Sequence, residues 1–339
     1  YLATLKSRIA EDKARLECLV ARLDRAGESY TAEDVVKLYL TPSNREDFFT
    51  FTRMLIGQLR QVGKTHTAER YVTVMNSFGR FHRENELLWE EVDSDLMVEY
   101  ETYLKSRGVC PNTSSYYMRG LRAIYNRAVE KGMTVQREPF KYVYTGIDKT
   151  IKRAVPLKVI RQIRDLDLTL FPTMDFARDI FMFSFYTRGM SFIDMAYLKK
   201  KDLQGGTLSY RRQKTGQQLF VKWEKPMQEI VDKYNTNGTP YLLPIIRDMN
   251  ADIRRQYKNA AHLVNDKLKK LGEKLGLTVP LTSYVARHGW ASIARSRNIP
   301  LAIISEAMGH DSEKTTRIYL ASLDTTSVDK ANSRILKAL

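Results

Sequence analysis

Apolar side chains recur every three or four residues along most of the chain, the spacing that predicts amphipathic helices. In the first segment Gly27 interrupts this pattern, and Thr31-Ala-Glu-Asp34 then predicts a capping box that opens a short helix to Leu40. Pro42-Ser43-Asn44 predicts a loop. Residues 1–44 are therefore predicted to form an N-terminal helical segment, which either packs on its neighbour or acts as a contact arm.

Four further helices are predicted between residues 45 and 132, and together they suit a compact all-helical domain. The residues expected to begin the last three of them are Thr67, Asp93 or Ser94, and Asn112 or Thr113. Helix ends are marked by Gly63, Gly108, Pro111 and Gly132. Residues 133–155 lack a long helical period and are dense in Lys and Arg, which favours a basic linker between domains.

A second domain is predicted over residues 156–339. Pro156 suits the first turn of a helix, and the apolar run from Phe176 to Phe185 predicts a buried helix. Residues 207–223 alternate β-prone positions around Lys214-Thr-Gly216, which predicts a β-hairpin. Two helical stretches follow around a loop at 235–244, and a helical tail is predicted over 327–339. The expected fold class is mainly α with a small β-hairpin or sheet.

Composition adds charge to this picture. The chain has 339 residues, 43% of them hydrophobic, which is enough for two domains that each bury a core. Lys+Arg number 55 against 39 Asp+Glu, and the net charge of +16 favours a polyanionic partner, although ribosomal and membrane-surface proteins are basic too. Cys18 and Cys110 show no metal-ligand spacing, and no signal peptide or long apolar span is visible. We expect a soluble cytoplasmic protein with no membrane partner.

Candidate chemistry gathers between residues 281 and 320. Arg287 and His288 stand near the start of one apolar helical run, Gly309-His310 ends a second run, and Tyr319 follows. An arginine can neutralise phosphate oxygens in a bidentate fashion. A tyrosine hydroxyl can act as a nucleophile on phosphorus. This order of residues therefore indicates phosphoryl transfer through a tyrosine.

These residues resemble the C-terminal motif of the tyrosine recombinase, or phage integrase, family, which reads His-x-x-Arg, Leu-Gly-His and then the nucleophilic Tyr. Met308-Gly309-His310 fits the second element, and Tyr284 stands where the family has its first histidine. That departure is similar to the variant found among Bacteroidetes integrases. The resemblance implies a SAM-like core-binding domain over residues 45–132, an α+β catalytic domain over 156–339, and a clamp closed around duplex DNA.

A segment upstream carries the same resemblance. Tyr186-Thr-Arg-Gly-Met-Ser-Phe-Ile-Asp194 stands where the family has Thr-Gly-Leu-Arg-x-x-Glu. Asp194 then takes the acidic position, where it is expected to support the site, and Ser191 stands where the first catalytic arginine belongs. The candidates to replace that arginine are Arg188 and Arg212, and the position of Arg188 within this segment favours it. Lys214 matches the family's hairpin lysine, the expected general acid.

The resemblance and the chemistry of phosphodiesters together imply a role for each residue. Arg287 and a second guanidinium bind the non-bridging oxygens, His310 donates a hydrogen bond to phosphate, and Lys214 protonates the leaving 5′-oxygen. Tyr319 forms a 3′-phosphotyrosine link, so the strands rejoin without ATP. His288 and Tyr284 are expected to support their neighbours. No carboxylate or His/Cys cluster suits a metal, so neither metal nor another cofactor is expected.

Contacts with the DNA backbone are expected from hydroxyl, amide and guanidinium groups at helix starts and polar faces. In the helical domain these residues are Thr67, Arg70, Asn112, Thr113, Ser115, Arg119 and Arg122. For any one of them capping or solvation is the better explanation, and only the cluster favours DNA. In the linker, Lys149, Lys152 and Arg153 are expected to follow the backbone.

The predicted function is site-specific DNA recombination, by integration, excision or inversion, in a bacterial cytoplasm. The resemblance implies a homotetramer on DNA that exchanges C-terminal tails, and accessory DNA-bending proteins are further candidate partners. Two alternatives remain open. A type IB topoisomerase shares the chemistry but relaxes DNA alone. A catalytically inactive DNA-binding accessory protein would fit the departures at Ser191 and Tyr284.

Overall fold

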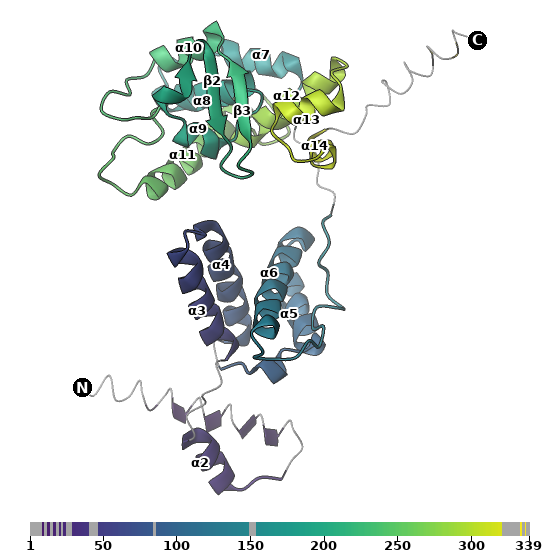
Figure 1. Ribbon diagram of the computed structural model, residues 1–339. Helices are drawn as coiled ribbons and strands as arrows, with labels where there is room; N and C mark the ends of the chain where they lie inside the picture. Colours follow the sequence, from purple (N-terminus) through teal and green to yellow (C-terminus); the bar gives the residue numbers. More distant parts are fainter. Residues whose placement is uncertain are drawn as a thin grey trace. The chain divides into compact units, whose positions relative to one another are not determined.

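The computed structural model describes residues 29–40, 47–83, 86–148 and 154–320, together with isolated positions between 9 and 24 and residues 333 and 336. The chain divides into two compact units, Tyr1–Lys149 and Thr150–Leu339 (Figure 1). Near the N-terminus, α2 (Ala32–Leu40) opens at the predicted capping box. There the Thr31 amide donates to Asp34 Oδ2 at 2.9 Å and the Asp34 amide donates to Thr31 Oγ1 at 3.3 Å. Within the described residues, no helix is long and apolar enough to cross a membrane.

The first unit is built from α3 (Phe48–Gln61), α4 (Thr65–His82), the short 3-10 helix η1 (Trp89–Glu91), α5 (Ser94–Ser106) and α6 (Pro111–Glu130). Its core is aromatic, with the Phe48 ring centroid 5.5 Å from that of Phe78 and 5.5 Å from that of Trp89. Asp93 caps α5 as predicted, accepting from the Leu96 amide. Phe140 and Val143 are buried in the same core, so part of the segment expected as a linker packs on this unit.

Two helix starts differ from the sequence expectation. Lys64 occupies the N-cap of α4, so Thr67 lies inside the first turn instead of capping the helix. Cys110 occupies the N-cap of α6, and Pro111 takes the first helical position, ahead of Asn112 and Thr113. Proline fits that position because its missing N–H would have no helical partner there. The predicted cap at Thr67 was therefore wrong by three residues, and the predicted start at Asn112 or Thr113 was wrong by one or two.

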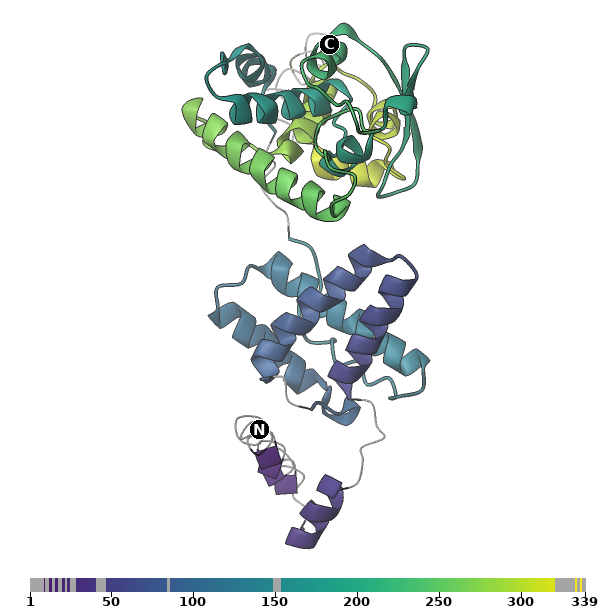
Figure 2. The same ribbon diagram turned by 90° about the vertical axis from the view of Figure 1, so that its left-hand side faces the viewer.

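The second unit is organised around α8 (Pro172–Tyr186), whose residues Ile180, Phe181 and Phe183 are buried. This helix packs against α7 (Leu157–Asp165), α10 (Lys225–Asp232), α11 (Ile253–Lys274) and α12 (Ser283–Ser296). In Figure 2, α11 is the long green helix along one side of the unit. The remaining helices are α9 (Phe192–Tyr197), η2 (Lys200–Asp202), α13 (Leu301–Ala307) and α14 (Glu313–Tyr319).

A small antiparallel sheet of order β1-β2-β3 completes the second unit, as Figure 1 shows beside α8. The predicted hairpin is present as β2 (Thr207–Arg211) and β3 (Gln218–Lys222), joined by the turn that holds Lys214. Tyr210 pairs with Leu219, and Leu208 pairs with Val221, and these pairs face the core. The two-residue strand β1 (Leu203–Gln204) adds a third member that is too short to predict. The mainly α fold class with a small sheet is confirmed.

Candidate active site

Arg287 lies in the middle of α12 and its side chain is almost fully enclosed, with 3% of the residue exposed. Its Nη1 donates to the Gly189 carbonyl at 2.6 Å, and its Nη2 donates to the Met308 carbonyl at 2.6 Å. Nη2 also lies 2.8 Å from His310 Nε2. A buried guanidinium is tolerated only when it is well hydrogen-bonded. These bonds hold Arg287 between the loop after α8 and the end of α13.

Arg212 follows β2 directly and is also buried, with 6% exposed. Its Nη1 donates to the Gly309 carbonyl, and its Nε lies 3.8 Å from Asp194 Oδ2. Arg287 and Arg212 therefore reach neighbouring carbonyls of the same Met308–Gly309 segment from opposite parts of the chain. The fold thus brings together two guanidiniums that lie far apart in the sequence.

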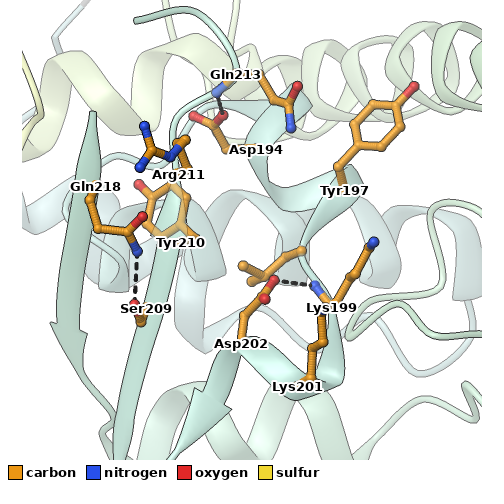
Figure 3. Close-up of a pocket in the computed structure, with 11 residues that line it drawn as sticks. Asp194, Tyr197, Lys199, Lys201, Asp202, Ser209, Tyr210, Arg211, Gln213 and Gln218 are labelled. Carbon is orange, nitrogen blue, oxygen red and sulfur yellow. Dashed lines mark hydrogen bonds between the residues drawn. The ribbon is translucent and has the colours of Figure 1, made fainter. Parts of the chain in front are cut away.

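Asp194 supports this arrangement from α9. Its Oδ2 accepts from the Ser191 hydroxyl at 2.5 Å. Its Oδ1 accepts from the Gln213 amide at 2.8 Å, the bond drawn in Figure 3. The residue is only 4% exposed, so the charge of its carboxylate must be balanced locally, by Arg212 and these two donors. Asp194 thus hydrogen-bonds the start of the hairpin turn and forms an ion pair with Arg212. Ser191 caps α9 and bonds Asp194, which is a structural use for the residue at the family's arginine position.

Two glycines make room for the two arginines. Gly189 has φ +76°, and a Cβ on it would lie 2.8 Å from Arg287 Cα. Gly309 has φ +64°, and a Cβ on it would lie 2.6 Å from Arg212 Cδ. At both positions the backbone is left-handed and the arginine is in close contact, and only glycine meets both demands. The glycine of the Gly309-His310 motif is therefore required on steric grounds, because any side chain there would collide with Arg212.

His310 is neutral and its tautomer follows from its partners. Its Nδ1 lies 2.8 Å from Thr316 Oγ1, and its Nε2 faces Arg287. Because a guanidinium has no acceptor, Nε2 must accept and Nδ1 must carry the proton that is donated to Thr316. Burial, followed by the positive charges of Arg287, Arg212 and Lys214, lowers the pKa of His310 from 6.5 to about 4. The ring is therefore uncharged at neutral pH.

The other candidates sit around this cluster. Lys214 is exposed in the hairpin turn, near enough for its charge to act on His310. Arg188 is half-buried at φ +62°, directly before Gly189. Its charge acts together with those of Arg287 and Arg212 on the buried hydroxyl of Tyr210, whose pKa is raised chiefly by desolvation. Sequence reasoning did not single out Tyr210, because alternation alone marks it as a core strand residue.

Tyr284 and His288 pair with each other, with ring centroids 5.0 Å apart in an edge-on geometry. Tyr284 is 51% exposed, whereas Arg287 is buried. Tyr319 is the last residue of α14, and its side chain lies outside the described part of the structure. Thr316, one turn before it, was missed by sequence reasoning although the spacing of three residues was a usable signal. The described residues contain no group of three or more His, Cys, Asp or Glu that could hold a metal ion.

In the first unit, several expected DNA contacts have structural partners. Asn112 Nδ2 donates to the Asp148 carbonyl at 3.2 Å, and the Asp148 amide donates back to Asn112 Oδ1 at 2.8 Å. Ser115 Oγ donates to the Gly146 carbonyl at 2.6 Å, and Arg119 Nε donates to the Ser115 carbonyl at 3.3 Å. These bonds tie residues 146–148 to the start of α6.

The other expected DNA contacts in that unit have looser surroundings. Arg70 stacks on Tyr116, with its Cζ 5.2 Å from the ring centroid. Thr113 Oγ1 lies 3.1 Å from Cys110 Sγ. Arg122 lines a pocket of about 300 Å³ with Lys141 and four other residues. Lys149, Lys152 and Arg153 lie outside the described residues.

A second pocket, of about 280 Å³, lies beside the hairpin in the second unit (Figure 3). Lys199, Lys201 and Arg211 give it a basic lining, and Asp194 and Tyr210 link it to the arginine cluster. Asp202 accepts from the Lys199 amide at 2.8 Å, and Gln218 Nε2 donates to Ser209 Oγ at 2.8 Å. The pocket therefore adjoins the arginine cluster, and its lining combines Lys and Arg with Asp194 and Asp202.

The comparison with known families agrees with this geometry. The phage integrase SAM-like domain matches residues 47–146, and the phage integrase family matches residues 172–326. These two matches cover most of the chain in the expected order. The protein therefore belongs to the phage integrase family, whose members are tyrosine recombinases, and the resemblance recognised in its motifs is confirmed.

Relatives of known type are distant. The chain is 23% identical over 263 residues to tyrosine recombinase XerA of Pyrococcus horikoshii, covering 68% of this chain and 90% of that protein. It is 25% identical over 282 residues to tyrosine recombinase XerC of Syntrophus aciditrophicus, covering 76% of this chain and 87% of that protein.

Solved structures give the same fold. A lambda integrase tetramer bound to a Holliday junction has a TM-score of 0.63 at 14% identity, covering 88% of this chain and 84% of that chain. The Tn1549 transposon integrase in complex with transposon right end DNA has a TM-score of 0.56 at 14% identity, covering 86% and 99%. At these identities the likeness establishes the fold.

Proposed function

We propose that this protein is a site-specific recombinase that cuts and rejoins duplex DNA through a covalent link to Tyr319. The observation that carries the proposal is the convergence of Arg287 and Arg212 on Met308 and Gly309, next to His310. Two guanidiniums fixed at neighbouring carbonyls form a preorganised site for a phosphodiester, and preorganised charge is the main source of catalysis in such a transfer. The helix that ends in Tyr319 begins three residues after His310.

The reaction would proceed as an in-line exchange. The Tyr319 oxygen forms a bond to phosphorus and releases its phenol proton to solvent, while the bond from phosphorus to the 5′-oxygen breaks. Lys214, exposed at the turn tip, gives its proton to that departing oxygen. The strand end is held as a 3′-phosphotyrosine, and attack by a 5′-hydroxyl of the partner strand reverses the step.

The N–H groups of Arg287 and Arg212 that remain after bonding the carbonyls would bind the non-bridging phosphate oxygens. We propose that His310 orients Arg287 instead of donating to phosphate, because its Nε2 accepts from Arg287 in this geometry.

The second guanidinium is assigned here to Arg212, although sequence position favoured Arg188. Arg212 contacts Gly309 and Asp194, and its charge acts on His310. Arg188 is half-buried and directly precedes Gly189. Arg212→Ala should lower the cleavage rate about 100-fold or more, the loss typical of a transition-state donor. Arg188→Ala should lower it less. A larger loss for Arg188→Ala would reverse the assignment.

The experiment that tests the function is cleavage of a nicked duplex, which traps the covalent intermediate because the short strand beyond the cut diffuses away. Candidate sites are taken from DNA flanking the gene, and full-length protein is incubated with chelator present. A covalent band with the wild type and none with Tyr319→Phe supports the proposal. Intact binding without any band would favour the inactive accessory protein. Relaxation of supercoiled DNA without a specific site would favour the topoisomerase.

The wider assignments belong to the same proposal. We propose an assembly of four copies on DNA, since a lambda integrase of this fold forms a tetramer on a Holliday junction. Three further proposals rest on the motif resemblance alone. They are exchange of the C-terminal tail between copies, assistance by DNA-bending proteins, and action in the cytoplasm of a bacterium as an integrase of the Bacteroidetes type. Sedimentation of the protein with a synthetic Holliday junction would test the tetramer.

A further inference from the structure

Among the described side chains of α14, Thr316 is the one that hydrogen-bonds His310 in the arginine cluster. It is fully buried, and its Oγ1 is the partner of His310 Nδ1 at 2.8 Å. The helix is otherwise anchored by its N-cap Ser312 and by buried Leu320, which packs with Ile304 and Met308. The hydrogen bond to His310 therefore joins the nucleophile's helix to the phosphate-binding arginines.

The bonds in this relay have a fixed direction. Arg287 can only donate, so its Nη2 donates to His310 Nε2, and the proton on Nδ1 is donated to Thr316. If the threonine hydroxyl were absent, the buried Nδ1–H would lose its acceptor. The ring would then favour the other tautomer, which sets Nε2–H against the N–H of Arg287. The Thr316 hydroxyl thus favours the tautomer in which His310 Nε2 is unprotonated and can accept from Arg287.

Thr316 also has a geometric relation to the nucleophile. It stands three residues before Tyr319 on α14, and residues three apart lie on one face of a helix. A displacement of α14 at Thr316 would therefore be passed to Tyr319. One hydroxyl is placed to set both the orientation of the guanidinium and the position of the attacking residue.

We propose that Thr316 is a positioning residue that holds His310 in its Nδ1–H tautomer and sets α14 so that Tyr319 meets the phosphate bound by Arg287. This inference rests on the proposed function, because it assigns Thr316 a role in that same strand cleavage.

The test uses three variants of the full chain. Thr316→Val keeps the shape and removes the hydroxyl, and Thr316→Ser keeps the hydroxyl. Thr315→Val is the matched control, because the Thr315 hydroxyl is next in sequence and lies 3.2 Å from Ser312 Oγ, away from His310. Two quantities are measured: the single-turnover cleavage rate at saturating protein, and the nitrogen shifts of His310 in protein labelled with ¹⁵N-histidine, which has five histidines to resolve.

Thr316→Val should keep wild-type DNA affinity, cleave about 10- to 100-fold more slowly, and move His310 out of the Nδ1–H form. Thr316→Ser should stay within a few-fold of wild type in both measurements, and Thr315→Val should match wild type. If Thr316→Val does not fold, Thr316→Ala is measured in its place. Slower cleavage with an unchanged His310 tautomer, or equal losses for Thr316→Val and Thr315→Val, would overturn the inference.

A failure of the proposed function gives a different result. In that case the wild type itself binds its site and forms no adduct, whereas the tautomer of His310 is measured without cleavage. A wild type that cleaves, together with a Thr316→Val variant that cleaves at the same rate, would refute only the role of Thr316.

Discussion

Replacement of Gly309 by alanine should destabilise the catalytic unit well beyond the ordinary effect of a glycine replacement. At φ +64° an alanine is strained, which costs about 1 kcal/mol. The new Cβ would also lie 2.6 Å from Arg212 Cδ and 2.9 Å from Leu219 Cδ1. Overpacking of this kind adds about 1–3 kcal/mol, so the total loss should be about 2–4 kcal/mol.

Gly276 provides a matched control, because it has the same φ of +64° and nothing lies within 4 Å of the position of its missing Cβ. Gly276→Ala should therefore lose only the strain of about 1 kcal/mol. The difference between the two variants isolates the contact with Arg212 and Leu219. Cleavage should fall in Gly309→Ala, because the displaced Arg212 also loses its bond to the Gly309 carbonyl, and should be unchanged in Gly276→Ala.

Urea unfolding followed by tryptophan fluorescence measures these losses. The chain has three tryptophans, and a Trp89→Phe background leaves Trp223 and Trp290, both in the second unit, as the reporters. If Gly309→Ala and Gly276→Ala lose equal stability, Gly309 does not lie against Arg212, and the account of the arginine cluster is refuted.

Three further predictions follow from the site and the linker. The pKa of His310 is about 4 in the folded protein and 6.5 in the unfolded chain, so between these pH values only the unfolded chain binds a proton at this residue. The free energy of unfolding should therefore fall by roughly 2 kcal/mol as the pH is lowered from 7 to 5. Urea titrations at both pH values should show that His310→Gln lacks this part of the loss; an equal loss in the variant would assign it to other groups. Lys214→Ala should slow cleavage about 100- to 1,000-fold on ordinary DNA but much less on DNA with a bridging 5′-sulfur, because a thiolate leaves without a proton; equal slowing on both substrates would deny Lys214 the acid role. Substitution of Lys149, Lys152 and Arg153 together should weaken binding to all sequences alike and flatten its salt dependence, whereas an unchanged slope in a salt titration would remove them from the interface.

Much of the fold could be predicted because its signals are local. The apolar run of α8, the Asp93 cap and the Lys214-Thr-Gly216 turn each act within a few residues. The prediction was wrong where one turn of helix precedes the expected cap, at Thr67, because threonine is tolerated inside a first turn as well as before it. β1 has only two residues, and its pairing with β2 is set by the turn between them.

The site could be predicted in its residue types and only partly in its geometry. The order of Arg287, Gly309-His310 and Tyr319 is visible in sequence, and so is Lys214 at a turn. The bond from Arg287 to Gly189 spans 98 residues, and the bond from Arg212 to Gly309 spans 97. Such contacts depend on how α8, α12 and the hairpin pack, which no local pattern encodes. Thr316 lies only six residues from its partner His310, but the loop between them interrupts the helical period that would have linked the two residues.

The central claim is that Tyr319 is the nucleophile held beside the arginine cluster. Its most direct test is to digest the covalent protein–DNA adduct from a nicked substrate and to locate the nucleotide-bearing residue by mass spectrometry. The chain has 19 tyrosines, so the assignment is a stringent one. The account predicts a peptide that contains Tyr319, the last residue of α14, and carries the nucleotide on that tyrosine. A nucleotide on any other residue would contradict it.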